Sequence, residues 1–220
     1  MRTLVEIALK YWPSLLKGTV VTLELTAASL LLSIVLGLAG AFGRLSGSRL
    51  VTRLTAVYVE VVRGTPLLLQ LFFVYFSLTQ FGIVLSGFTA ATIALGVFGG
   101  AFLTEIFRGG IQAIERGQLE AAYSLGMSHR EAMRKIILPQ AVRLVLPPLA
   151  NHAILTLKNT SIVVTIAVND LMYEAYNGAS VTFRAMEFYT LAGLIYLAFC
   201  YPMSRLLAAF EDRWNVQPGT

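Results

Sequence analysis

Charged side chains are scarce in this chain. Only 13% of its 220 residues are Asp, Glu, Lys or Arg, whereas 56% are hydrophobic. Soluble domains carry about 25% charged residues, so the composition excludes an ordinary soluble domain. No charged residue occurs between Gly64 and Thr104, nor between Leu25 and Gly43. Because about 20 apolar residues cross the hydrocarbon core of a bilayer, these runs predict an all-α integral membrane protein.

Other absences exclude further classes. A single cysteine, Cys200, cannot form an intramolecular disulfide. The two histidines have no second ligand at metal-binding spacing, so we expect no metal site. The phosphate-binding pattern G-x-x-x-x-G-K-[ST] does not occur, so we expect no nucleotide site of that kind. The basic residues lie in short stretches between apolar runs, which indicates membrane topology rather than nucleic-acid binding.

The apolar runs predict five spans within a single transmembrane domain, residues 1–220. An N-terminal stretch with Tyr11 and Trp12 is predicted to be an interfacial helix that is broken near Pro13. The second span is expected to break at RGTP (63–66), because Thr caps helices and Pro favours the first helical position. The five spans are expected at about 19–43, 54–80, 88–107, 140–167 and 186–208.

The distribution of basic residues predicts the orientation. Lys and Arg gather after the first and third spans and at the C-terminal end, whereas the loop between the second and third spans has none. Basic loops stay in the cytoplasm. We therefore expect the C-terminus and residues 109–139 inside, the N-terminus outside, and residues 168–185 to be a polar external loop.

The polar segment 118–139 carries several helix-boundary signals. Glu120 lies early in a short helix that Gly126 can end in the left-handed conformation. Ser128 and Glu131 form an S-x-x-E capping box for a second short helix. On these residues alone, a hairpin that merely caps the bundle is as well supported as a docking element.

The same segment contains a longer pattern: EAA, three residues, Gly, nine residues, then Ile-x-Leu-Pro. Every fixed position is present, at Glu120, Ala121, Ala122, Gly126, Ile136, Leu138 and Pro139. This resembles the cytoplasmic EAA loop of permease subunits in binding-protein-dependent ABC importers. Segments 58–76, 105–122, 138–154 and 157–166 resemble the branch that imports polar amino acids such as histidine, arginine, glutamine and glutamate. One departure is Asn159, where many members have Asp.

The resemblance implies a type I ABC importer permease fold in the inner membrane of a prokaryote, without enzyme activity or a bound cofactor of its own. It implies three protein partners: a cytoplasmic ATPase that uses ATP and Mg²⁺, an extracytoplasmic substrate-binding protein, and a second permease copy or paralogue. A polar amino acid would be the substrate. The residues expected to couple the permease to the ATPase are Glu120, Ala121, Ala122, Gly126, Ser128 and Glu131.

Lys158 is the main candidate for substrate binding, because charges inside a membrane are costly and usually functional. It is followed by Asn159, Thr160 and Ser161, so four polar side chains occur together in the fourth span. Pro147 and Pro148 upstream predict an irregular helix there. The alternative is a structural polar network.

Glu105 and Arg108 form a second candidate group, since residues three apart share one helix face. An interfacial salt bridge is as well supported for them as a substrate role. In the functional hypothesis, Lys158 or Arg108 binds the carboxylate of an amino acid and Glu105 its ammonium group, because charge-assisted hydrogen bonds are the strong ones.

Two rival functions remain open from the sequence. One is a transporter or channel driven by an ion gradient, although such folds usually contain inverted repeats and none is found here. The other is a structural membrane subunit without a pathway, against which the polar group at 158–161 argues.

Overall fold

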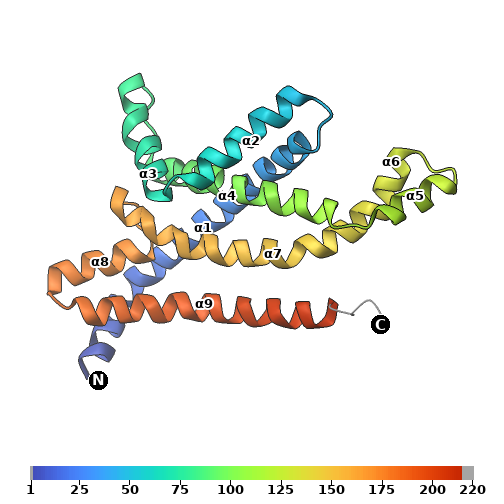
Figure 1. Ribbon diagram of the computed structural model, residues 1–220. Coiled ribbons are helices and arrows are strands. Elements are labelled where there is room, and N and C mark those ends of the chain that lie inside the picture. The colour runs from blue at the N-terminus through green and yellow to red at the C-terminus, as the bar shows by residue number, and fades with distance from the viewer. Residues whose placement is uncertain (1, 215–220) are drawn as a thin grey trace.

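The computed structural model describes residues 2–214, which contain helices and no strand, so the predicted all-α fold is confirmed for them (Figure 1). The α-helices are α1 (Arg2–Arg44), α2 (Arg49–Gly64), α3 (Leu67–Phe72), α4 (Gly87–Gln112), α5 (Arg116–Ser124), α6 (His129–Ala132), α7 (Leu138–Asn159), α8 (Leu171–Thr182) and α9 (Ala185–Trp214). Four shorter segments with π or 3-10 geometry join them: η1 (Phe73–Ser77), η2 (Leu78–Phe81), η3 (Met133–Ile137) and η4 (Thr160–Ile166).

Three helices within the described residues are long and apolar enough to cross a bilayer, namely Leu4–Arg44 of α1, α4, and Ala185–Ala209 of α9. Two further candidates are bent pairs. The first joins α2 to Leu67–Phe81 at 106°, and the second joins His129–Ile166 to α8 at 46°. Counting each bent pair as one span gives the five that the sequence predicts.

The break in the first bent pair lies where the sequence predicts it. Helix α2 ends at Gly64 and α3 begins at Leu67. The expected capping detail is wrong, because Pro66 takes the N-cap position and the Thr65 hydroxyl donates back to the Val61 carbonyl. Helix α2 is held against α4 by the Tyr58 hydroxyl, which donates to the Val97 carbonyl at 2.8 Å.

The N-terminal region differs from the prediction. Helix α1 passes through Pro13 without a break, so the separate interfacial helix expected there is wrong. At 1.5 Å per residue its 43 residues span about 65 Å, more than twice the roughly 30 Å hydrocarbon core. The first turns of α1 are therefore a continuation of the span beyond that core.

Helices α1 and α4 form the centre of the bundle through small residues. A Cβ placed on Gly96 of α4 would lie 2.5 Å from the Leu32 side chain, and one on Gly37 of α1 would lie 2.5 Å from Leu103. Real Cβ atoms do not approach other atoms so closely. The two helices can pack at this distance because glycine has no side chain at these positions.

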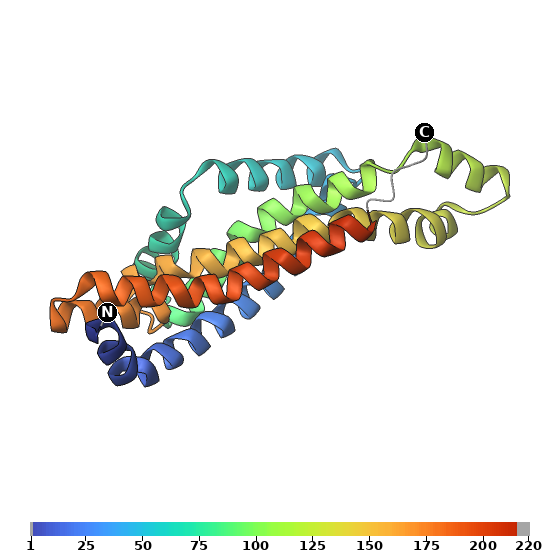
Figure 2. The same ribbon diagram turned by 90° about the horizontal axis from the view of Figure 1, so that it is seen from below.

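The chain ends and the α5–α6 segment mark two opposite ends of the molecule. The N-terminus lies at one end, and the C-terminal turns of α9 lie at the other, toward α5 and α6 (Figure 2). The external loop expected at 168–185 is wrong in its conformation, because most of it is helix α8. The tail beyond Trp214 lies outside the described residues.

Candidate functional site

The first candidate site is the α5–α6 hairpin, residues 116–137, which projects beyond the end of the bundle (Figure 1). Helix α5 ends at Ser124, and Gly126 two residues later has a φ of 76°, which is left-handed as the sequence predicts. The Gly126 N–H donates to the Tyr123 carbonyl at 2.9 Å, and the Met127 N–H donates to the Ala122 carbonyl at 3.1 Å. These two bonds are those of a Schellman motif, which satisfies the last carbonyls of a helix and fixes the turn.

The predicted capping box at the start of α6 is confirmed. The Glu131 N–H donates to the Ser128 hydroxyl, and the Ser128 N–H donates to the Glu131 carboxylate at 3.1 Å. The bond from the Ser128 N–H, then that from its hydroxyl, and then the Lys135 ammonium, hold the pKa of Glu131 below its usual value. Both ends of the turn between the two helices are therefore fixed by the local sequence.

The hairpin presents only part of its EAA motif to the outside. Glu120 and Ala121 are exposed, whereas Ala122 is buried. Tyr123 is half-exposed, and its hydroxyl forms a 2.8 Å hydrogen bond with Nδ1 of His129. Ala122 therefore supports the hairpin from inside.

The second candidate site is a cavity of about 320 Å³ where α7 and η4 meet α8 and α9. We call it the polar cavity; it is lined by Lys158, Ser161, Met172, Tyr189, Ala192, Gly193 and Tyr196. The Ser161 hydroxyl donates to the Lys158 carbonyl at 2.8 Å, so both residues are joined at the end of α7. The cavity thus combines one ammonium group with hydroxyl groups from α9 and η4.

The structure separates the four consecutive polar residues. Lys158 and Ser161 line the polar cavity, but Thr160 is fully buried on another face and donates to the Leu157 carbonyl. Asn159 is half-buried and is not among the cavity residues. The irregular backbone begins at Thr160, because α7 continues as a helix through the two prolines and gives way to 3-10 geometry only there.

Glu105 and Arg108 do not share this cavity. The Arg108 guanidinium forms an ion pair with Glu105 at 2.5 Å, and Arg44 at the end of α1 lies 3.4 Å from the same carboxylate. In the antiparallel packing of α4 and α7, Gly110 lies against Val145 and Gly99 against His152. Lys158 is therefore about ten residues, or roughly 15 Å, further along α7 than the level of Glu105.

A family model for inner membrane components of binding-protein-dependent transport systems matches residues 29–216. The chain belongs to this family. It is 41% identical over 192 residues to a Bacillus subtilis protein named "Probable glutamine ABC transporter permease protein GlnM", covering 87% of this chain and 89% of that one. It is 34% identical to the glutamine transport system permease protein GlnP of Escherichia coli, covering 93% and 96%.

Solved structures agree with the family assignment. A crystal structure of an amino acid ABC transporter with histidines superposes with a TM-score of 0.89 at 41% identity, covering 93% of this chain and 96% of that chain. The MetNI methionine ABC transporter matches with a TM-score of 0.72 at 19% identity, which shows the fold alone. The predicted permease fold is confirmed, and the chain is an inner-membrane permease component of a kind that is not itself catalytic.

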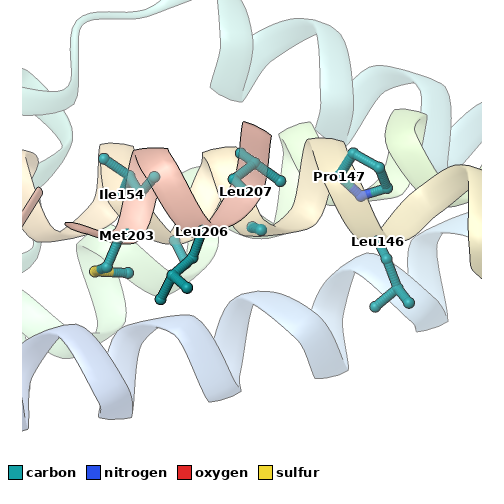
Figure 3. Close-up of a pocket in the computed structure, with 8 residues that line it drawn as sticks. Leu146, Pro147, Ile154, Met203, Leu206 and Leu207 are labelled. Atoms are coloured by element: carbon teal, nitrogen blue, oxygen red, sulfur yellow. The ribbon is translucent and has the colours of Figure 1, made fainter. Parts of the chain in front are cut away.

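A second cavity in this permease lies between α7 and α9, along the contact that we call the α7–α9 seam (Figure 3). Its volume is about 360 Å³, and its lining is almost wholly apolar: Leu146, Pro147, Ala150, Ala153, Ile154, Met203, Leu206 and Leu207. Its α7 residues precede Lys158 and its α9 residues follow Tyr196, so it continues the polar cavity toward the end with the hairpin. The seam is polar at one end and apolar at the other.

The sequence did not lead us to predict that α9 lines the polar cavity of this permease. Tyr189 and Tyr196 are seven residues apart and line the polar cavity from one helix face. The spacing was the available signal. Neighbouring aromatic residues in an apolar helix follow the same period for packing alone, so the pattern does not by itself distinguish a cavity wall from a core.

Proposed function

We propose that this chain is the permease subunit of an ATP-driven importer for a polar amino acid, and that it works with a separate ATPase and a substrate-binding protein. The α5–α6 hairpin carries the proposal. Its EAA pattern is complete, both ends of its turn are fixed by hydrogen bonds, and it stands clear of the bundle. A short rigid helix pair of this kind can pass a rigid-body movement from one domain to another.

The identity of the relatives supports a polar amino acid as substrate. Relatives that cover 84–93% of this chain are named as permeases for glutamine, arginine and L-cystine. The polar cavity offers matching chemistry, since an ammonium group can bind a substrate carboxylate with a charge-assisted hydrogen bond. We place the substrate of this chain there, with Lys158 as the residue that binds the carboxylate.

The exposure of Lys158 supports a second permease copy or paralogue against α7 and α9. Asn151 and Lys158 are seven residues apart and both exposed on α7. A lysine that faces lipid within a membrane span is costly, so it usually faces water or a partner. A water-filled pathway between this chain and a second permease would remove this cost. Helix α9 has surface available for such a contact, because only 11% of its most apolar 18-residue stretch is buried.

The proposed orientation places the hairpin and the C-terminal end of α9 in the cytoplasm and the N-terminus outside. Support comes from the basic residues of the hairpin and from the separation of the two chain ends (Figure 2). The ATPase would then meet the hairpin from the cytoplasm, and the binding protein would reach the polar end of the seam from outside.

Substrate uptake by a Lys158→Ala variant tests the proposed site. In proteoliposomes that contain the permease and its ATPase, supplied with loaded binding protein, uptake falls while ATPase binding is unchanged. Lys10→Ala is the matched control, since it removes one exposed lysine from α1 that does not line the cavity. Wild-type uptake by Lys158→Ala would contradict the proposal that the polar cavity binds the substrate.

The rival function, transport driven by an ion gradient, is separated by the same preparation. Uptake that persists without ATP and without an ATPase chain, and that follows an imposed ion gradient, would favour the rival. Copurification of an ATPase chain in mild detergent, together with uptake that requires ATP, supports the importer.

A further inference from the structure

The polar cavity contains a single charged side chain. Of the residues that line it, only Lys158 carries a charge. Lys158 is exposed on α7, and no carboxylate among residues 4–209, whose side chains are described, forms an ion pair with it. An amino acid that enters the cavity therefore meets one positive charge that no carboxylate in this part of the chain neutralises by contact.

The carboxylates on the elements around the cavity are engaged elsewhere. Asp170, the residue before α8, is fully buried and accepts one hydrogen bond from the backbone of α8 and another from the Tyr196 hydroxyl. Glu174 of α8 lines a separate small pocket against α1. Glu187 of α9 lies 4.0 Å from Arg184. None of these three acids lines the polar cavity, so a positively charged group of a substrate contacts no carboxylate there.

Amino acids differ in how their side chains interact with the Lys158 charge. All of them carry the same α-carboxylate and α-ammonium group, so these two groups do not discriminate between substrates. A side-chain cation places a second positive charge in a cavity of about 320 Å³, whereas a side-chain carboxylate offsets the first. The difference is larger than in water, because charges interact more strongly in a medium of low dielectric constant. The lysine ammonium group has three N–H donors, which are enough to bind two carboxylates.

We propose that Lys158 is a specificity-determining residue that excludes basic amino acids, so that the substrate of this chain has a neutral or acidic polar side chain. Glutamine and glutamate meet this condition, and arginine and lysine do not. Binding of the α-carboxylate and rejection of a side-chain cation are then two effects of one ammonium group. The inference rests on the proposed function, because it assumes that the polar cavity holds the amino acid.

Pairs of amino acids with the same shape isolate the effect of charge. L-citrulline has the length of L-arginine with an uncharged group in place of the guanidinium, and L-glutamine is the uncharged counterpart of L-glutamate. The experiment measures equilibrium binding of these four radiolabelled amino acids to the detergent-purified permease–ATPase complex. The binding protein is left out, so that its own selectivity does not contribute.

The wild-type complex should bind L-arginine about tenfold more weakly than L-citrulline. Two like charges about 10 Å apart at an effective dielectric constant of about 20 produce an effect of this size. L-glutamate should bind at least as tightly as L-glutamine. If neither of the longer amino acids binds, the L-glutamate and L-glutamine pair decides, and weaker binding of L-glutamate would contradict the inference.

Gly193 allows the charge of the cavity to be changed without a steric clash. It lines the cavity from α9, and a Cβ placed on it meets no atom within 4 Å. Gly193→Asp adds a carboxylate, and Gly193→Asn is the uncharged control of the same size. We expect Gly193→Asp to abolish or reverse the preference for L-citrulline over L-arginine, whereas Gly193→Asn keeps it. If Gly193→Asp does not assemble, the two pairs of amino acids on the wild type decide.

The results separate this inference from the proposed function. Equal binding of L-arginine and L-citrulline by the wild type, with weaker binding of both in Lys158→Ala, would overturn the inference and leave the cavity as the substrate site. The same preference in Gly193→Asp and Gly193→Asn would also overturn it. Unchanged binding in Lys158→Ala, or binding of none of the four amino acids by the wild type, would overturn the cavity itself and the inference with it.

Discussion

Replacement of Gly126 by valine should uncouple the hairpin from transport while the spans stay inserted. No atom lies within 4 Å of a Cβ built on Gly126, so the substitution introduces no steric contact. The whole penalty comes from the backbone, because a φ of 76° is unfavourable for residues with a Cβ. The left-handed conformation costs about 1–2 kcal/mol for an ordinary residue, and valine is among the worst suited.

This penalty competes with the two Schellman hydrogen bonds that end α5. At 1.4 kcal/mol per factor of ten in an equilibrium constant, a cost of 1–2 kcal/mol reduces the population of the native turn by roughly 5- to 30-fold. Gly117 is a matched control, because it is also open to solvent with no neighbour within 4 Å but does not have a positive φ. Gly117→Val lies inside α5, where valine is no worse than glycine.

The assay is ATP hydrolysis by the reconstituted complex with and without loaded binding protein, together with a pull-down of the ATPase. Gly126→Val should lose the stimulation or the ATPase itself, and Gly126→Asn should lose less because Asn tolerates this conformation. Wild-type stimulation and uptake in Gly126→Val would show that the hairpin is only a cap on the bundle.

Three further predictions follow from the packing, the topology and the capping box. Gly99→Leu should destabilise the bundle by about 1–3 kcal/mol, because the new side chain would overpack against Ser33 and His152. Gly109→Ala is the control, since a Cβ at Gly109 meets no neighbour. Thermal unfolding in detergent measures both variants, and equal melting temperatures would contradict the α1–α4 packing. In a Cys200→Ser background, the cysteine of Ser180→Cys should react with an impermeant thiol reagent on intact cells, because residue 180 is expected outside. The cysteine of Arg130→Cys should not react, because the hairpin is expected in the cytoplasm. The reverse result would contradict the proposed membrane orientation. Because hydrogen bonds lower the pKa of Glu131 from its usual 4.5, the capping box should be present above that value and be lost only as pH falls through the lowered pKa. Amide exchange at Ser128 and Glu131 measures this, and loss of protection already near neutral pH would contradict it.

The features that the sequence predicts well are those with short-range causes. The break after Gly64, the left-handed Gly126 and the capping box at Ser128 each depend on the residues within one helical turn. The predicted span positions stay a prediction, which depends on apolar length and on the thickness of the bilayer. The family pattern in the hairpin adds a long and specific match, so the function class follows from the same residues.

The errors have long-range causes. Pro13 does not break α1, so the local effect of the proline is overridden in the folded bundle. Residues 171–182 look like a polar loop, yet they form α8 because Asp170 caps them and α1 and α9 cover them. The residues that line the polar cavity depend on which residue of α9 faces Lys158. The sequence pattern of a single helix does not show how α9 is aligned against α7.

The most direct test of the central claim is uptake by proteoliposomes that contain this permease with its copurified ATPase. Radiolabelled L-glutamine and L-arginine are supplied on the outside with the binding protein, and ATP is enclosed or omitted. We predict accumulation of a polar amino acid only when ATP, the ATPase and the binding protein are all present. Equal accumulation without ATP, or without the ATPase chain, would contradict it.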